Sequence, residues 1–319
     1  MKRPLRRQNG IALITAIILV AIAAVLATAI GFASAMSARR ASAMFGADQA
    51  FLAAEGVEAL AADVLKMTAA NNTIFSLDQQ WALPYGPFEL TDGVTLEFAQ
   101  LEDEQGKFNI NNLAANGSTD TTKALILFQQ LLEQVGLETK WAGLIADWID
   151  QDNTPNTPDG AEDSVYLSQT PPYRTANLPV TSVSELLALP GFGRNRYDRL
   201  VPYIAALPPG TTINICTASG VILDSMAGPG KNEYSSDPAN LANERKNNGC
   251  FPTQAVYMST LSSEAKNLVN NWIGTNTSYF RLRSFITIGT ARFTLYSLLY
   301  RDNSSSGQIR PILRTFGTE

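Results

Sequence analysis

The sequence contains no histidine and only two cysteines among its 319 residues. Without histidine the chain cannot use a Ser-His-Asp or Cys-His nucleophile, histidine-based proton transfer or a His-ligated zinc site. The GxSxG, HExxH and phosphate-loop patterns are absent as well. The enzymatic alternative that stays open is a membrane-anchored or secreted hydrolase that works through carboxylates alone.

Charge is also missing from a long stretch, because no charged residue occurs between Arg7 and Arg39. As a helix, the run from Ile11 to Ala38 would be about 42 Å long, enough to cross a bilayer core of about 30 Å. Four basic residues precede this run, whereas only Arg39 and Arg40 follow it closely. This asymmetry predicts a single membrane span with a cytoplasmic amino terminus and the bulk of the chain on the other side.

The apolar run has two interpretations. Ala33-Ser34-Ala35 fits a signal-peptidase site, which would give a secreted chain that starts after Ala35. However, apolar residues continue at spacings of three and four beyond it, with Asp48, Glu55 and Glu58 expected elsewhere around the helix. We therefore favour one continuous helix, half in the membrane and half in water, that ends near Met67 to Asn72. Its apolar face would contain Ala50, Ala54, Val57, Ala61 and Val64.

A short basic leader that ends in Asn9-Gly10 and leads directly into an aliphatic helix resembles a type IV prepilin or a type II secretion pseudopilin. The resemblance implies that a prepilin peptidase cuts between Gly10 and Ile11 and methylates the new amino terminus. Most members of these families carry a Glu at the fifth position after the cut, where this chain has Thr15. In pilins that Glu is thought to neutralise the amino terminus of a neighbouring subunit.

The missing Glu suggests a position at the tip of a filament. A buried charge at membrane depth costs about 3 kcal/mol or more, and it needs a paired charge to offset that cost. A subunit with no neighbour ahead of it would lack that partner, so Thr15 would be the better residue there. We therefore hypothesise a tip subunit.

The charge balance of the remaining chain argues against nucleic-acid binding. Removal of the four basic leader residues leaves 20 Lys and Arg against 29 Asp and Glu, a net charge near −9. Phosphate binding depends on a basic surface, so we expect no nucleic-acid partner. A hairpin-like stretch, Leu189-Pro190-Gly191 with Phe192-Gly193, resembles a helix-hairpin-helix. We interpret it as a tight turn that packs two helices, with DNA contact as the alternative.

Cys216 and Cys250 are predicted to form a disulfide, because an even pair in an exported chain usually does so. The segment between them, Thr217 to Gly249, is rich in Asn, Gly, Ser and Lys, and we expect it to be a long mobile loop.

Periodicity predicts an α+β fold, a pilin-like domain with a large inserted all-α domain. Alternating residues predict strands at 88–90, 94–98, 279–288, 292–300 and 308–316, with Phe108 to Asn111 as part of an antiparallel sheet. Asp92-Gly93 and Asn303 to Gly307 are predicted as turns between strands. Helical periods occupy 120–135, 141–148, 184–189, 195–204 and 262–272. The expected organisation is a leader (1–10), a transmembrane and assembly segment (11–38), helix and first strands (39–113), a helical insertion (114–210) and the remaining sheet (211–319).

The acidic loop from Asp147 to Asp163, which lies between two of the predicted helices, predicts a Ca²⁺ site. Its proline and glycine residues shape a loop on which flexible carboxylates can supply the six to eight oxygen ligands that Ca²⁺ requires. The spacing does not match an EF-hand, and a solvated acidic loop without an ion is the alternative. We expect Asp150, Asp152, Glu162 and Asp163 as ligands, with Asp147 and Asp159 in reserve.

Six motifs occur in a fixed order: the Gly10-Ile11 leader, Phe108 to Asn111, Asp147 to Asp163, Pro171 to Arg174, Leu189 to Gly191 and Ile213 to Thr217. Together they resemble the general secretion pathway protein K family of minor pseudopilins. The resemblance implies a non-enzymatic subunit of the bacterial inner membrane, with its bulk in the periplasm. It implies a cap that nucleates the pseudopilus with minor pseudopilins I and J, alongside the major pseudopilin, the prepilin peptidase and the inner-membrane assembly platform. Contact with the secretin or with exoproteins stays open.

Overall fold

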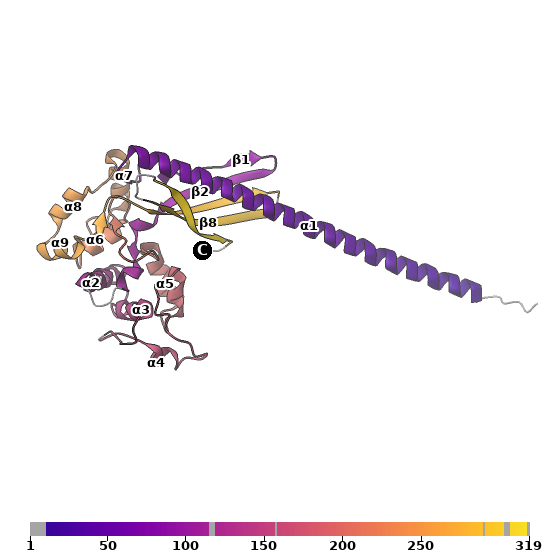
Figure 1. Cartoon of the computed structure of the whole chain (residues 1–319), viewed down its shortest axis with the longest axis horizontal. Coiled ribbons are helices and arrows are strands. Elements are labelled where there is room, and N and C mark those ends of the chain that lie inside the picture. Colours follow the sequence, from indigo (N-terminus) through magenta and orange to yellow (C-terminus); the bar gives the residue numbers. More distant parts are fainter. Residues whose placement is uncertain (1–10, 115–118, 157, 290, 303–306, 318–319) are drawn as a thin grey trace, which may run out of the picture.

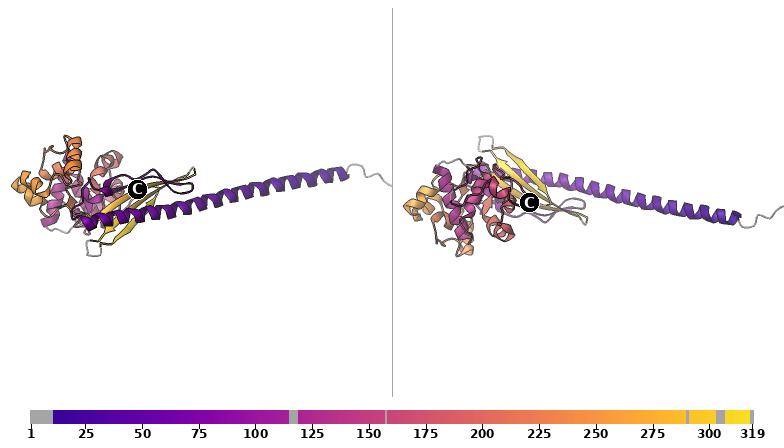
Figure 2. Two further views of the ribbon diagram at one scale, coloured as in Figure 1. Left: turned by 90° about the horizontal axis from the view of Figure 1, so that it is seen from above. Right: turned by 90° about the horizontal axis from the view of Figure 1, so that it is seen from below.

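The first helix dominates the architecture (Figure 1). The computed structural model describes residues 11–114, 119–156, 158–289, 291–302 and 307–317. Helix α1 (Ile11–Asn71) is one continuous helix and ends within the predicted range. Its first half extends away from the rest of the chain, and its second half lies along a sheet (Figures 1 and 2). The proposed leader, residues 1–10, lies outside the described residues.

The second half of α1 packs on the sheet mainly through small side chains. Ala50, Ala54, Val57 and Leu65 are at most 3% exposed. Their spacings of three, four and eight residues place them on one face of the helix. They form a core with strand residues that include Leu96, Leu101, Phe280, Leu282, Ile286, Leu295 and Leu299.

Among the described residues, antiparallel strands form a five-stranded sheet in the order β1-β2-β7-β8-β9. Gly93 closes the predicted β1–β2 turn with φ at 75°, a value that glycine adopts without steric cost. The strand predictions agree within a few residues except at β2, which continues to Asp103. The predicted turn from Asn303 to Gly307 falls mostly outside the described residues. The strands are β1 (Phe88–Thr91), β2 (Val94–Asp103), β7 (Tyr279–Ile288), β8 (Ala291–Arg301) and β9 (Ile309–Phe316).

A mostly helical region is inserted between β2 and β7, and it lies at the end of the sheet remote from the free half of α1 (Figure 1). Two short parallel strand pairs also occur there: β3 (Phe108–Asn109) with β4 (Ile204–Ala205), and β5 (Ile213–Asn214) with β6 (Ile273–Gly274). The fold is therefore α+β, as predicted. The helices of this region are α2 (Thr119–Gln134), α3 (Trp141–Ile149), α4 (Asp163–Tyr166), α5 (Gly193–Leu200), α6 (Gly220–Ala227), α7 (Pro238–Asn248), α8 (Gln254–Thr260) and α9 (Ser263–Val269). Short 3-10 helices along the described chain are η1 (Gln80–Ala82), η2 (Glu104–Gly106), η3 (Ile110–Leu113), η4 (Val183–Ala188) and η5 (Val201–Tyr203).

Two expectations about the helical region were wrong, one at its start and one at its end. Phe108 to Asn111 does not belong to the antiparallel sheet, because β3 pairs in parallel with β4 and the chain then turns into η3. Helices also continue beyond residue 210 as far as Val269, so the helical insertion is not confined to 114–210. The apolar side chains of these later helices share one core with those of α2 and α3.

The expected mobile loop from Thr217 to Gly249 was wrong as well, since α6 and α7 occupy most of it. Helix α6 starts at Ser219, whose side chain accepts a hydrogen bond from the N–H of Ile222. Helix α7 buries only Leu241 and Arg245 and exposes its other, mostly polar residues. A helix with so few buried residues has the composition of a loop, which explains the error.

Buried polar residues connect the sheet to the helical region. Asp103, at the end of β2, accepts hydrogen bonds from Asn214 Nδ2 (2.9 Å), Thr217 Oγ1 (2.6 Å) and Thr277 Oγ1 (2.7 Å). The N–H of Gln105 donates to its other oxygen at 2.8 Å. Burial raises the pKa of Asp103 more than these hydrogen bonds lower it, so that its pKa is about 6. We call Asp103, Asn214, Thr217 and Thr277 the joint.

Candidate cation site and assembly helix

The free half of α1 is an unpartnered apolar rod. Of the described helices, only α1 is long and apolar enough to cross a membrane, and its most apolar 18-residue window has no buried residue. Almost every residue from Ile11 to Ala38 is exposed. Thr15 lies in this half, and its Oγ1 donates to the Ala12 carbonyl at 3.0 Å. Its polar hydrogen is thus bonded within the helix and needs no partner subunit.

The two halves of α1 are joined without a break, and a charged contact fixes the half that packs on the sheet. Glu58 is 4% exposed and accepts hydrogen bonds from Arg314 Nη2 (2.6 Å) and Ser297 Oγ (2.6 Å). The sequence interpretation placed Glu58 away from the packed face, and this was wrong. Its position four residues after Ala54 and three before Ala61 was the signal that could have placed it on the buried face.

Three of the predicted cation ligands come together in the acidic loop. Ligand oxygens of Asp150, Asp152 and Glu162 lie within 4.8 Å of one another. Asp150 directly follows α3, and its N–H donates to the Ala146 carbonyl at 2.9 Å, which ends that helix. Glu162 directly precedes α4 and is only 4% exposed. We call these three residues the acidic cluster.

The acidic cluster is electrostatically strained without a cation. Burial, together with the neighbouring carboxylates of Asp152 and Asp147, raises the pKa of Asp150 to about 6. Burial, and then the charges of four surrounding carboxylates, raise the pKa of Glu162 to about 7. Both shifts show that a negative charge on these groups is disfavoured unless a positive charge compensates it.

Unpaired oxygens are the clearest sign that the cluster fits a cation. Both carboxylate oxygens of Glu162 and Oδ1 of Asp150 are buried and have no hydrogen-bond partner among the described residues. The same holds for Oδ1 of Asn177, whose Nδ2 donates to the Asp152 carbonyl at 3.2 Å. An unpaired buried oxygen is costly, and a hard cation that prefers oxygen ligands would remove that cost. The sequence interpretation missed Asn177, because it lies 25 residues after Asp152.

The other predicted ligands face elsewhere. Asp163 accepts hydrogen bonds from the N–H and Oγ1 of Thr175 at 3.1 and 3.0 Å, and it pairs with Arg174 at 3.5 Å. Asp147 is fully buried and bonds to the backbone and side chain of Asn156. Asp159 is exposed. The acidic cluster therefore contains three of the four first-choice ligands and neither reserve.

A cluster of three aromatic side chains supports the acidic loop. The rings of Trp148, Tyr166 and Tyr173 contact one another with centroids 5.1 to 6.4 Å apart. Gly160 packs so closely against Asn156 and Asp147 that a Cβ at this position would collide with backbone atoms. This packing holds the loop in place, so the positions of the carboxylates in the acidic cluster do not depend on a cation alone.

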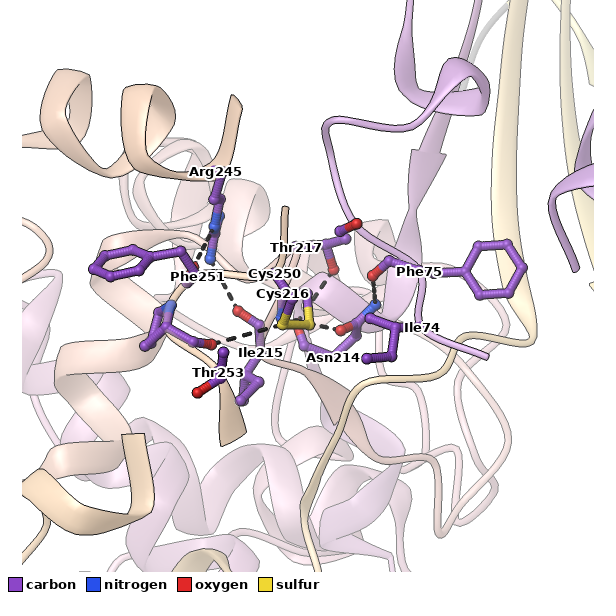
Figure 3. Close-up of a disulfide and its surroundings, with 12 residues drawn as sticks. Ile74, Phe75, Asn214, Ile215, Cys216, Thr217, Arg245, Cys250, Phe251 and Thr253 are labelled. Atoms are coloured by element: carbon purple, nitrogen blue, oxygen red, sulfur yellow. Dashed lines mark hydrogen bonds between the residues drawn. A yellow bond between two sulfur atoms is a disulfide. The ribbon is translucent and has the colours of Figure 1, made fainter. Parts of the chain in front are cut away.

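The disulfide between Cys216 and Cys250 is present as predicted, with the two Cα atoms 4.5 Å apart (Figure 3). It lies next to the joint, because the Cys216 N–H donates to Asn214 Oδ1 at 3.0 Å. Arg245 is buried beside it and donates to the carbonyls of Ile215 (2.9 Å) and Phe251 (2.8 Å), as Figure 3 shows. The disulfide therefore attaches α7 to the strand that carries the joint.

The hairpin-like motif is a packing turn. Gly191 and Gly193 both adopt positive φ, at 78° and 69°. Between them Phe192 is fully buried, edge-on to Trp141 at 5.1 Å. Arg196 donates to the carbonyls of Gly191 and Phe192 at 3.1 and 3.2 Å. These contacts fix the turn against α3.

Comparison with known proteins places the chain among secretion-system subunits. Residues 106–209 match the family described as type II secretion system (T2SS), protein K, and residues 9–57 match PilX N-terminal. Type II secretion system protein K of Pseudomonas aeruginosa is 32% identical over 98% of this chain and 94% of its own length. The protein of the same description from Klebsiella pneumoniae is 29% identical over 95% and 96%.

A solved structure has the same fold. The crystal structure of the GspK-GspI-GspJ complex from the type 2 secretion system of enterotoxigenic Escherichia coli contains a chain that superposes with a TM-score of 0.72. The match covers 88% of this chain and all of that chain at 24% identity.

Proposed function

This chain belongs to the type II secretion system protein K family, and we propose that it caps the tip of the pseudopilus as a minor pseudopilin that nucleates assembly. The observation that carries this proposal is the placement of its two unusual parts. The apolar half of α1 is free at one end, and the helical region lies at the other end of the sheet (Figure 1). A subunit built this way can join a filament below itself, whereas the helical region would obstruct a subunit above.

Thr15 supports the tip position. Its hydroxyl is satisfied inside α1, so it needs no charged partner from a preceding subunit. Thr15→Glu should leave pseudopilus assembly unchanged or reduce it, because the new carboxylate would be buried without a partner charge. Thr15→Ser is the matched control, since it keeps the hydroxyl. A clear gain of assembly with Thr15→Glu would contradict the tip position.

The proposed partners are minor pseudopilins I and J, because a related fold is found in a complex of GspK with GspI and GspJ. The major pseudopilin, the prepilin peptidase and the inner-membrane assembly platform would act with it, and the secretin or exoproteins are further candidates. We propose cleavage between Gly10 and Ile11 with methylation of Ile11, and a cytoplasmic amino terminus. The bulk of the chain would then be periplasmic. The carboxylate-dependent hydrolase that composition left open has no support from the family.

We also propose that Ca²⁺ binds the acidic cluster, with Asp150, Asp152 and Glu162 as side-chain ligands and Asn177 as an additional one. The ion would neutralise the cluster and hold the end of α3 to the start of α4. Calorimetric titration of EGTA-treated protein with CaCl₂ measures this directly, and the absence of a binding isotherm at millimolar Ca²⁺ would refute it.

Co-expression with proteins I and J of the same organism tests the central proposal. A tagged, full-length chain should retain both partners in detergent, and mass spectrometry should find methyl-Ile11 as its first residue. Excess chain should shorten pseudopili, because each cap ends one filament. Pseudopili of unchanged length, or a chain that retains neither partner, would reject the cap, and a mature start after Ala35 would support the secreted alternative.

A further inference from the structure

The face of the sheet turned away from α1 carries an unusual set of side chains. Alternation along the strands buries Leu282 and Ser284 toward α1 and leaves Arg283 and Phe285 partly exposed on the outer face. Phe98 of β2 lies directly opposite Phe285, and the two rings stack with centroids 5.7 Å apart. The outer face is therefore aromatic at the centre of the sheet.

Two arginines stack on these rings. The Arg292 guanidinium lies 4.1 Å from the centroid of Phe285, and that of Arg283 lies 5.8 Å from the same ring and 5.4 Å from Phe98. Stacking uses the flat faces of the guanidinium groups and leaves N–H groups at their edges for hydrogen bonds. We call Phe98, Arg283, Phe285 and Arg292 the arginine platform.

The arginine platform has no counter-charge of its own. Within the described part of the chain, no carboxylate lies within ion-pair distance of Arg283 or Arg292, and the buried Nε of Arg283 has no acceptor. By contrast, Arg281 on the same strand pairs with Glu104 at 3.1 Å, and Arg314 pairs with Glu58 at 2.6 Å. Two like charges beside one ring repel each other, so anions bound to these arginines would be favourable.

The arginine platform continues into a cleft. Arg283 lies opposite Tyr296, and Arg281 lies opposite Leu298. Tyr296 and Leu298 line a cleft of about 510 Å³ between the outer face and the helical region, with Leu313 on β9 and Leu187 on η4. Leu313 and Leu187 are 48% and 41% exposed. Exposed aliphatic and aromatic side chains beside arginine are typical of protein interfaces.

We propose that the outer face of the sheet docks an acidic segment of another protein, whose carboxylates bind Arg283 and Arg292 while its apolar side chains enter the cleft. Charge complementarity favours this partner, because an acidic segment is repelled by most of a chain whose net charge is −5, or near −9 without the proposed leader, and is attracted here. A lipid headgroup would engage the arginines and leave the apolar cleft empty. The proposal goes beyond the capping role and does not depend on it.

Selection from a random twelve-residue peptide library on immobilised full-length chain tests the proposal. Selected peptides should contain Asp or Glu next to apolar residues and should bind the Arg283→Gln, Arg292→Gln double variant at least about tenfold more weakly by fluorescence anisotropy, as expected for loss of charge-assisted hydrogen bonds. Replacing the carboxylates of the peptide by amides should have the same effect. Arg310→Gln is the matched control, because Arg310 also stacks on a ring of the sheet, that of Tyr300 at 5.6 Å.

Equal binding to the wild type and the double variant would overturn the proposal. So would a selection that yields no carboxylate-dependent peptide. Phosphatidylglycerol vesicles provide the competing partner, and arginine-dependent binding of vesicles without binding of any peptide would overturn it in favour of a lipid surface. Circular dichroism and the melting temperature of the double variant confirm that both proteins are folded.

Discussion

The joint and the acidic cluster each contain a buried carboxylate, Asp103 and Glu162, but the groups around these two carboxylates differ. At the joint, four donors surround one carboxylate, Asp103. At the acidic cluster, three carboxylate oxygens of Asp150 and Glu162 have no donor among the described residues. Burial raises pKa values at both sites, so burial alone does not distinguish them.

The difference lies in what satisfies the charge. A carboxylate whose two oxygens both accept hydrogen bonds from the protein is a structural connection, because its charge is compensated within the chain. A carboxylate without donors is complete only when something else binds. The joint therefore fixes the helical region on the sheet, whereas the acidic cluster is the site at which we expect an ion. Four experiments can break or sharpen this contrast.

Loss of the disulfide beside the joint should have the largest effect. Cys216 and Cys250 are 34 residues apart, and closing a loop of this length contributes about 4 kcal/mol on the chain-entropy model. Urea unfolding of the Cys216→Ala, Cys250→Ala variant should show a loss of that order. The wild type with its disulfide reduced is the control, and it should unfold at the same urea concentration as the variant. A loss below about 1 kcal/mol would show that the helices α6 and α7 hold this segment without the covalent link.

Asp103→Ala should be nearly as damaging, at about 3 kcal/mol, because four buried donors would lose their acceptor. Glu102→Ala is the matched control, since the neighbouring Glu102 makes only a long 3.9 Å pair with Lys107, and its loss should cost less than about 1 kcal/mol. Urea unfolding of both variants measures the difference. Equal stabilities would mean that the joint does not hold the two regions together.

Calcium should stabilise the acidic cluster by about 1.4 kcal/mol at ten times its Kd. Thermal unfolding with CaCl₂ should show a higher Tm than with EGTA, and MgCl₂ at the same concentration should have little effect. Asp150→Asn should abolish the shift, whereas Asp163→Asn should preserve it because Asp163 already bonds to Thr175. Loss of the shift in Asp163→Asn would restore the larger ligand set expected from sequence.

The smallest expected effect is the change of folding stability with pH. The joint and the acidic cluster should lose stability over different pH ranges. A raised carboxylate pKa in the folded state means that stability is greatest below the unfolded value and falls as pH rises through the folded value. The contribution of Asp103 should fall between about pH 4 and 6, and that of Glu162 between about pH 4.5 and 7. Saturating Ca²⁺ should remove only the loss of stability that comes from Glu162. Tm measured against pH in EGTA and in CaCl₂, with Glu162→Gln as control, tests this; identical profiles would refute the contrast.

Local signals predicted the pilin-like half of the chain well. The apolar run of α1, the alternation in β7 and β8 and the turn at Asp92-Gly93 each depend on neighbouring residues, so the sequence contains the information. The helical region was harder to predict because its later helices are short and partly polar. Helix α7 buries only Leu241 and Arg245, and such a helix is stabilised by its tertiary contacts rather than by its own amphipathic pattern.

The candidate cation site was partly predictable for the same reason. Asp150 and Asp152 adjoin the end of a predictable helix, and an acidic loop with proline and glycine is visible in the sequence. Asp163 is adjacent to Glu162, yet the two side chains have different partners, and only the backbone path at the start of α4 decides which one faces the ion. Asn177 lies too far along the chain for any spacing rule to include it.

The sequence by itself determined the membrane helix, the strands, the cysteine pair and the concentration of carboxylates, because hydrophobic period, turn chemistry and composition are local properties. Tertiary structure alone decided which buried charges are satisfied. Among the described residues, it brought donors from two distant segments, 214–217 and 277, to Asp103, left the carboxylate of Glu162 without any, and stacked Arg283 and Arg292 on one ring without a counter-charge. These outcomes depend on long-range approach in space, and no pattern along the chain encodes that approach directly.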